Sequence, residues 1–373
     1  MSNYLITLSP LGKFFFGGDM TFQVGEEEKS KFNQAYASYI IESCKFPQQT
    51  SLLGMMRYLL LTKCPDAFDL AKRRIKDHNL ATSLIGASSF SVKESHNTLN
   101  NYGKIKSLGP CVLMDRSKQP NEVYLPSPKD FGLHVKFNNL SRTTYYNGER
   151  RVVPNIDNYD PKTPQETVYI GTQSGSTQKE DELFTKDVRI GINKNYKGKS
   201  DAKGFYKQIS YRLKKDFCFA FAIETDFDLS NCQNELVSLG ADGSKFALSA
   251  SLSDKFEISY PVLPLSNIGE TCSRIVLLSD TLLEEEDLWL SCFSISELVG
   301  FRYLKTTVHT ENYNITKGQV ERSQKKYDLY KKGSVFYFDN PKQATEFKER
   351  IKSKKEFNQI GYNYYTEINI KNE

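Results

Sequence analysis

Apolar residues follow two different spacings along the chain, and together these spacings predict a mixed α+β fold. Residues 4–8 form a β-like run, whereas the leucines and methionines from Leu52 to Leu60 recur at helical spacing after Pro47. Further strands are expected at 188–192, 205–213, 217–225 and 246–250, and further helices at 66–78 and 228–237. If the helix at 66–78 is counted as part of an insertion, the order of strands and helices along the chain is that of a ferredoxin-like domain. The insertion then follows the first helix of that domain.

A second set of elements begins near Lys255. Strands are expected at 256–260, 273–278, 288–293, 335–338 and 362–370, with a helix at 341–355 before the last of them. We therefore predict an α+β protein of two ferredoxin-like (RRM-like) domains. The first would span residues 1–252 with an insertion at about 65–185, and the second residues 253–373.

The composition excludes several classes of protein. An apolar content of 39% with 24 Phe and 22 Tyr supplies a core, so the chain is not disordered. The richest apolar run, 52–61, is too short to cross a membrane and contains Arg57, and the first residues lack the features of a signal peptide. The 7 Cys include no Cys-x-x-Cys pair, which argues against a zinc site and favours free thiols in a reducing cytoplasm. We expect a cytoplasmic protein without a metal or another cofactor.

The net charge of +5 conceals a strong asymmetry along the chain. Residues 186–215 contain ten basic and two acidic residues, and residues 317–355 contain twelve basic and five acidic ones. The rest of the chain is therefore acidic. Both basic windows also contain several Tyr and Phe. Basic groups that meet phosphates, interleaved with rings that stack on bases, suit single-stranded nucleic acid, although Lys-rich loops also occur simply as solvated surface.

Motifs for catalysis are weak. Gly198-Lys199-Ser200 resembles the end of a phosphate-binding loop, but Asn193 stands where that loop needs glycine. Gly17-Gly18-Asp19 resembles the metal-binding turn of nucleotide cyclases but lacks the second acidic residue, so a tight turn is the better interpretation. The four histidines are scattered. One of them could serve a metal-free ribonuclease as general base, but a structural role is expected for each.

The start of the helix at 49–57 is a candidate phosphate site, because free N–H groups and the helix dipole attract anions. Gly54 would let another backbone approach, and Arg57 projects from the same side of the helix. The alternative is a core helix whose glycine packs on a strand and whose arginine pairs with a carboxylate, and the sequence alone favours that alternative.

Several segments, in the same order along residues 14–363, together resemble the third-subunit family of Cmr complexes. These are RAMP proteins of type III-B CRISPR effectors, related to the Cas-five group. The matching segments are 14–22, the helix at 49–57, which resembles the family's Thr-x-x-Gly-x-x-Arg helix, Val188–Ile192 with Gly204-Phe205-Tyr206, the turn Leu239–Gly243, 274–279, Gly333–Phe338 and Ile360–Asn363. The chain departs from the family pattern at Gly17, Thr21, Ala241 and Lys332. It therefore resembles a divergent member.

The resemblance implies a non-catalytic subunit that holds the 5′ repeat-derived tag of a CRISPR RNA. It would dock on the large Cas-ten-type subunit and on neighbouring Cmr backbone subunits, and meet target RNA only indirectly. A thumb-like β-hairpin would fall on the 186–215 window. The implied RNA-binding residues are Gly54, Arg57, Arg189, Lys194, Lys197, Lys199, Lys203, Tyr206, Gly240, Gly243, Gly333 and Ser334. Two alternatives stay open: a metal-independent RAMP endoribonuclease that processes CRISPR precursor RNA, and a general single-strand-binding module.

Overall fold

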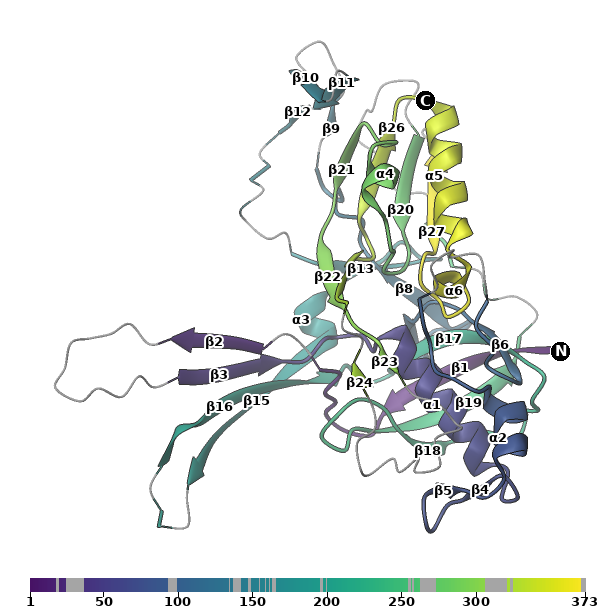
Figure 1. The fold of residues 1–373 in the computed structure, drawn as a ribbon. Coiled ribbons are helices and arrows are strands. Elements are labelled where there is room, and N and C mark those ends of the chain that lie inside the picture. Colours follow the sequence, from purple (N-terminus) through teal and green to yellow (C-terminus); the bar gives the residue numbers. More distant parts are fainter. Residues whose placement is uncertain are drawn as a thin grey trace.

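A computed structural model shows an α+β protein in which sheets predominate and helices are few (Figure 1). The structure describes residues 1–17, 20–24, 37–92, 99–133, 135–136, 142–146, 149–153, 155–157, 159–160, 162, 166–194, 197–198, 200–253, 256, 258–261, 273–305, 321–322 and 325–369. In this part of the chain, no helix is both long and apolar enough to cross a membrane.

The largest element is a nine-stranded sheet with the order β14-β13-β8-β7-β17-β1-β19-β18, to which β6 adds by pairing with β17. Its strands are β1 (Ser2–Pro10), β6 (Ile105–Leu108), β7 (Val112–Asp115), β8 (Glu122–Pro126), β13 (Val168–Gly171), β14 (Thr177–Lys179), β17 (Phe217–Thr225), β18 (Glu235–Ser238) and β19 (Lys245–Leu252). The predicted strands at 4–8, 217–225 and 246–250 are therefore confirmed. They lie side by side, with β1 between β17 and β19.

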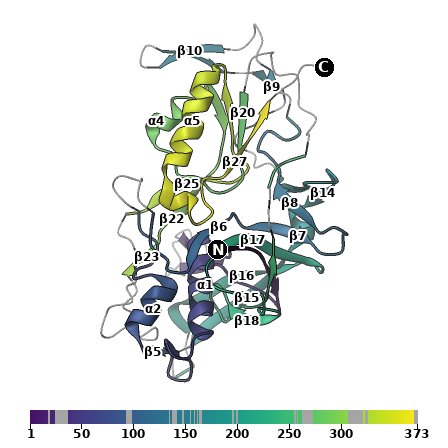
Figure 2. The ribbon, with the colours of Figure 1, turned by 90° about the vertical axis from the view of Figure 1, so that its right-hand side faces the viewer.

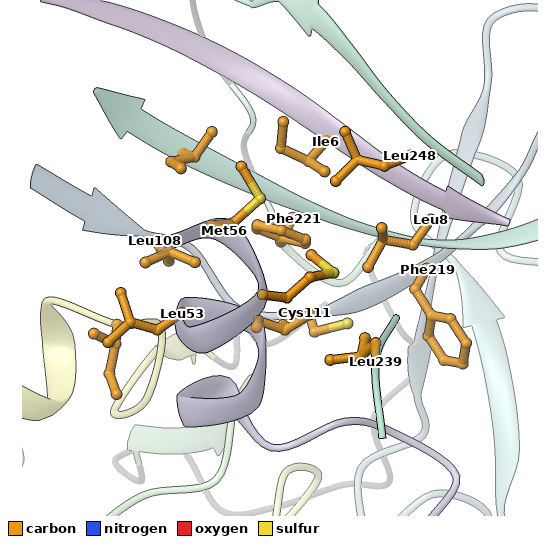
Figure 3. Close-up of a cluster of buried hydrophobic side chains, with 14 of the residues drawn as sticks. Ile6, Leu8, Leu53, Met56, Leu108, Cys111, Phe219, Phe221, Leu239 and Leu248 are labelled. Atoms are coloured by element: carbon orange, nitrogen blue, oxygen red, sulfur yellow. The ribbon is translucent and has the colours of Figure 1, made fainter. Parts of the chain in front are cut away.

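Two helices, α1 (Gln49–Thr62) and α2 (His78–Ile85), cover one face of this sheet. Alternate side chains of β1, including Ile6 and Leu8, point from the sheet toward the Leu53 and Met56 side of α1, as Figure 3 shows. All four side chains are almost completely buried. Because apolar burial is the main stabilising contribution to folding, this cluster anchors the N-terminal half of the molecule.

A second, four-stranded sheet has the order β21-β26-β20-β27. Its elements follow the chain as β20 (Ser273–Leu277), α4 (Glu285–Leu288), β21 (Phe293–Ile295), β26 (Val335–Phe338), α5 (Pro341–Ser353), α6 (Lys355–Asn358) and β27 (Tyr365–Asn369). The helix α5 packs on one face through Ala344, Phe347 and Ile351. The opposite face packs on the nine-stranded sheet, because Val276 and Tyr337 share one core with Met114 and Leu125. Figure 2 shows the second sheet, with α5 on one side of it, above strands β6, β17, β7 and β8 of the first.

A buried ion pair crosses the junction between the two sheets. The Arg274 guanidinium of β20 donates to both carboxylate oxygens of Asp130, with an Nε–Oδ2 distance of 2.6 Å, and the Tyr337 hydroxyl donates to the same carboxylate. Hydrogen bonds from Arg274 to Asp130 raise the pKa of the guanidinium against the opposing effect of burial. The predicted boundary near residue 252 stays a prediction, since the sheets on either side of it share a core.

The remaining elements are short or project from the two sheets (Figure 1). They are β2 (Met20–Val24), β3 (Ala37–Glu42), β4 (Phe68–Asp69), β5 (Arg74–Ile75), β9 (Val135–Lys136), β10 (Arg142–Tyr146), β11 (Glu149–Val153), β12 (Asn155–Ile156), α3 (Glu180–Leu183), β15 (Phe184–Lys194), β16 (Ser200–Leu213), β22 (Leu298–Phe301), β23 (Leu304–Lys305), β24 (Glu321–Arg322) and β25 (Tyr327–Tyr330). Of these, β15, β16, β3 and β2 form a four-stranded sheet that extends away from the body.

Three predicted features of the first domain are wrong. Residues 66–78 contain the small β4–β5 hairpin, and the helix α2 follows it because Asp77 caps its first N–H groups. Residues 228–237 contain no helix, since the chain forms strand β18 on the edge of the nine-stranded sheet. The predicted strands 188–192 and 205–213 lie outside that sheet. Their place beside β17 is taken by β6 and β7, which come from the predicted insertion.

Candidate nucleic-acid interface

The long hairpin of β15 and β16 projects from the body of the molecule (Figure 1). Its strands pair from Phe184↔Leu213 to Lys194↔Ser200, with an irregularity after Ile192. At the base, Phe184 and Tyr211 are buried and contact each other edge to face, which fixes the hairpin to the core. β16 also pairs in parallel with β3, so a second pair of strands supports the hairpin along one side. The hairpin predicted at the 186–215 window is confirmed as an element of the structure.

One face of the hairpin carries Arg189, Gly191 and Tyr206. Arg189 is exposed and stands opposite Gln208, and Gly191 stands opposite Tyr206. The Tyr206 ring lies across the glycine, because a Cβ added at residue 191 would lie 2.3 Å from the nearest ring atom. Tyr206 is still 43% exposed. The ring is thus held by the backbone of β15 and partly open to solvent, as a stacking platform requires.

The turn at 240–243 lies against this face. Gln208 of β16 donates a hydrogen bond from Nε2 to the Asp242 carboxylate. Gly240 and Gly243 have φ values of +87° and +69°, and Asp242 of +54°, which is the left-handed region. In the described part of the chain, the N–H groups of Asp242 and Gly243 have no hydrogen-bond partner, and both residues are exposed. Backbone N–H groups presented in this way suit an anion.

The phenylalanine-rich segment near the N-terminus holds the turn in place. Ala241 N–H donates to the Phe15 carbonyl at 2.8 Å, and Phe15 N–H donates to Ser244 Oγ at 3.0 Å. A Cβ at residue 240 would lie 2.3 Å from the Phe15 carbonyl oxygen, so only glycine fits there. The same segment reaches the hairpin, where Phe14 and Tyr211 exchange backbone hydrogen bonds. Three segments that are distant in sequence therefore meet at one site: 14–17, 206–211 and 240–244.

Other cations near the base of the hairpin are partly neutralised. Arg212 and Lys13 both bind Asp187, and Lys186 binds Glu42. Hydrogen bonds from Arg212, and then from Lys13, hold the pKa of Asp187 below its usual range. Among the described residues, by contrast, Arg189 and Lys194 have no acidic partner. Arg189 and Lys194 therefore carry positive charge on the hairpin that no described carboxylate neutralises.

The four predicted RNA-binding lysines of the hairpin differ in how much the structure shows of them. Lys194, at the end of β15, and Lys197, in the turn, are exposed. Lys203 lies within β16. Lys199 lies outside the described residues.

The predicted phosphate site on α1 is filled by the chain itself. The almost completely buried Tyr362 side chain lies beside Gln49 and Thr50 at the start of α1, and burial raises the pKa of its hydroxyl. Gln49 Nε2 donates to the carbonyls of Gly109 and Ile360, each at 2.9 Å. The helix start is thus closed by the C-terminal segment 360–362, and the structure leaves no room for a phosphate there.

Gly54 and Arg57 were predicted to bind RNA, but the structure places both of them outside the interface. Arg57 is 8% exposed, and its Nε donates to the Ile85 carbonyl at 2.8 Å. The guanidinium therefore closes the C-terminal end of α2, where free carbonyls need donors. Gly54 is exposed, and nothing lies within 4 Å of a Cβ added there, so no backbone approaches it. The structural alternative was right about the burial of Arg57, and the hydrogen bonds of its guanidinium include those to the Ile85 and Gly86 carbonyls.

Gly333 and Ser334 also serve the interior. Gly333 has a φ of +87°, its N–H donates to the Leu277 carbonyl at 2.7 Å, and its carbonyl accepts from Lys129 N–H. Ser334 is fully buried, and its Oγ donates to the Lys331 carbonyl at 2.7 Å. Gly333 ties the start of β26 to β20 and to the segment that follows β8, and Ser334 closes the turn before β26. Both residues are buried, so in this conformation neither is accessible to RNA.

Sequence reasoning missed Gln208, Asp242 and Gly191. The role of Gly191 could have been predicted from the sequence, because a glycine inside a β-rich run indicates the close approach of another group. The contact between Gln208 and Asp242 joins two segments 34 residues apart and leaves no local signal. In the described part of the chain, no three His, Cys, Asp or Glu side chains lie close enough to hold a metal ion.

Comparison of the sequence with models of known protein families identifies the family of the chain. The model of the CRISPR-associated protein Cas_Cmr3 matches residues 6–159 and 150–369. The chain belongs to the Cmr3 family. This confirms the resemblance seen in the sequence motifs, including those at 14–17 and 239–243, which the fold brings together.

Comparisons with individual proteins add little to the Cmr3 match. No curated protein matches the chain. Similar solved structures include the type III-B Cmr-beta complex bound to cognate target RNA and AMPPnP, and the same complex bound to cognate target RNA. For these the TM-score is 0.47, the identity 12% and 13%, and the coverage 98% of this chain and 96% of the other. An apo-state Cmr-beta structure matches with a TM-score of 0.28 and 10% identity, over 67% of this chain and 97% of the other.

Proposed function

We propose that this Cmr3-family chain is a non-catalytic, RNA-binding subunit of a type III-B Cmr interference complex. It would hold the 5′ repeat-derived tag of the CRISPR RNA and dock on the large Cas-ten-type subunit and neighbouring backbone subunits. The observation that carries the proposal is the projecting β15–β16 hairpin, where Arg189 and Lys194 lack acidic partners in the described chain and Tyr206 offers a ring beside them.

The turn at 240–243 supports the same proposal. Its glycines allow the backbone to approach a ligand closely, and the N–H groups of Asp242 and Gly243 face outward beside the hairpin. Phosphate would be held by Arg189, while a base stacks on Tyr206. Guide RNA would then continue along the lysines of the hairpin, Lys194, Lys197, Lys199 and Lys203.

The order of the strands supports a ferredoxin-like interpretation of both halves. In the second sheet, the strands lie side by side in the order β21-β26-β20-β27. The helix α4 lies between β20 and β21 along the chain, and α5 lies between β26 and β27. In the first sheet, β7, β17, β1 and β19 are neighbours in the corresponding order, and α1 follows β1. We propose that the first half is a ferredoxin-like unit whose second helix is replaced by the chain that forms β18.

Co-purification tests the proposal most simply. The tagged full chain, expressed in its own cell, should bring down other Cmr-type subunits and RNAs that share one 5′ sequence. A pull-down that contains neither would contradict it. In a second assay without metal, the pure chain should leave labelled repeat RNA intact. Discrete cleavage that is lost when one histidine (His78, His96, His134 or His309) is changed to alanine would establish the endoribonuclease instead.

A further inference from the structure

Two acidic side chains lie on the face of the hairpin that carries Arg189 and Tyr206: Asp187, which is neutralised by Lys13 and Arg212, and Asp242, which has no cationic partner in the described chain. Asp242, at the tip of the 240–243 turn, contacts Gln208 of β16, and Gln208 stands directly opposite Arg189. Tyr206 lies two residues along the same strand on the same face. A cation, a ring, an amide and a carboxylate are therefore gathered over a few residues of one sheet face.

The backbone conformation of the turn explains why residue 242 is an aspartate but not why its carboxylate contacts the hairpin. A φ of +54° favours aspartate or asparagine over other non-glycine residues. It does not require a hydrogen bond to the hairpin. The turn is already fixed by three other hydrogen bonds: Ala241 N–H donates to the Phe15 carbonyl, Phe15 N–H donates to Ser244 Oγ, and Ser244 Oγ donates to the Ala241 carbonyl. The contact between Asp242 and Gln208 therefore gives the carboxylate a defined position on the hairpin face and is not needed to form the turn.

The charge of Asp242 identifies which part of an RNA it would face. A carboxylate beside a phosphate repels it, so this group would weaken a purely electrostatic RNA path. Facing a base, the same group is useful, because an ionised carboxylate only accepts hydrogen bonds and bases differ in the donors they present.

The hydrogen bond to Gln208 narrows the choice of base. Since the carboxylate cannot donate, the amide must turn its NH₂ toward it. The amide oxygen of Gln208 and the second carboxylate oxygen of Asp242 have no other partner in the described chain. Both remaining groups are acceptors. They match edges with exocyclic amino groups, as in guanine, adenine and cytosine. Uracil presents a single N–H between two carbonyls and is a poor match.

We infer that the Asp242–Gln208 pair is a base-specificity site that selects a nucleotide with an exocyclic amino group and disfavours uracil. The nucleotide would stack on Tyr206 while Arg189 holds its phosphate. This inference rests on the proposed RNA-binding function and extends it from holding the RNA backbone to selecting one base.

Binding of short labelled RNAs to the full chain tests this site. The probes are an oligouridine and three otherwise identical strands in which one uridine is replaced by guanosine, adenosine or cytidine, with the replacement placed at each position in turn. The unchanged protein should bind the best-placed amino-bearing strand about tenfold more tightly than oligouridine. Asp242→Ala should abolish this preference. Asp242→Asn, which keeps the turn conformation and size, should also reduce it, because the amide now presents donors to uracil.

Asp181→Asn is the matched control, since it removes the same charge from an exposed residue of α3 outside this face. It should leave the preference unchanged. Equal loss of affinity for all four strands in the Asp242 variants would assign Asp242 a purely structural role and overturn the inference. So would a wild-type protein that binds all four equally. In both cases salt-dependent RNA binding would persist, and the proposed function would stand. Absence of any RNA binding would remove both.

Discussion

The two basic windows of the chain, 186–215 and 317–355, differ in where their acidic partners lie. In the second window Lys354 and Arg350 bind Asp287, Lys348 binds Glu367, and Lys331 binds Glu297. In the first, Lys186 and Arg212 are paired near the base of the hairpin, and Arg189 and Lys194 have no acidic partner in the described chain. Similar positive charge in the sequence therefore serves folding in one region and is available for a ligand in the other.

This difference has a physical origin in burial. A lysine that folds into a core must be paired or lose its charge, because desolvation of an isolated ion is very costly. Lys354 and Asp287 are each 4% exposed and obey this rule. A cation on a projecting strand keeps its hydration and needs no partner. Burial together with pairing therefore identifies structural cations such as Lys354, which net charge alone does not.

The largest expected effect tests the structural half of this comparison. Lys354→Met removes the buried partner of Asp287, leaves it only the more exposed Arg350 at 3.6 Å as a cationic partner among the described residues, and should lower the free energy of unfolding by about 3 kcal/mol. Chemical denaturation measures it. At a temperature where the variant is folded, its RNA affinity should equal that of the unchanged protein. Loss of less than about 1 kcal/mol would contradict the structural role of this cation.

The next effect tests whether Tyr206 stacks on a base. Tyr206→Ala should cost about 1–3 kcal/mol of RNA-binding free energy with little loss of stability. Gly191→Ala should have a similar effect, because its methyl group would displace the ring. A double-mutant cycle measured by RNA binding separates the two: the double variant should be no worse than Tyr206→Ala alone. Additive losses would show that residue 191 acts independently of the ring.

A further effect is a pH dependence of stability that comes from Lys332, in the second window. Its ammonium lies over the Phe46 ring, and burial lowers its pKa to about 8. The unfolded chain therefore binds more protons at this residue than the folded chain between about pH 8 and 10.5. Raising the pH through this range should stabilise the fold, by at most about 1.4 kcal/mol per pH unit.

Comparison with a variant isolates the Lys332 contribution, because buried tyrosines and thiols such as Tyr102 and Cys111 have raised pKa values and oppose it in the same range. The stability of the unchanged protein relative to Lys332→Met should rise from pH 8 to pH 10. A flat difference would show that the ammonium is not desolvated.

Local pattern predicted the elements of the fold whose signal lies within one segment. The apolar spacing of Leu52–Leu60 gave α1, and the β-like run at 4–8 gave the centre of the large sheet. Pattern failed where neighbours decide. Residues 228–237 became partly strand because β19 offers an edge, and the hairpin left the main sheet because β6 and β7 occupy the place beside β17.

The candidate site was predicted in the same uneven way. Arg189, Lys194, Tyr206 and the glycines of the 240–243 turn fall on one exposed region, because charge, rings and turn residues are visible in sequence. Arg57, Gly333 and Ser334 were assigned to RNA from motifs alone, yet carbonyls that only the fold brings near them use their donors. Sequence shows which groups are present but not which partners the fold supplies.

Salt-dependent RNA binding of two matched triple variants tests the central claim most directly. One changes Lys194, Lys197 and Lys199 to alanine, and the other changes Lys342, Lys352 and Lys355 on α5 and α6, which are exposed and belong to the second window. The hairpin variant should bind single-stranded RNA more weakly and lower the slope of log K against log salt by about 2, whereas the helix variant should change neither. Equal effects of the two variants, or no effect of the hairpin variant, would contradict the account.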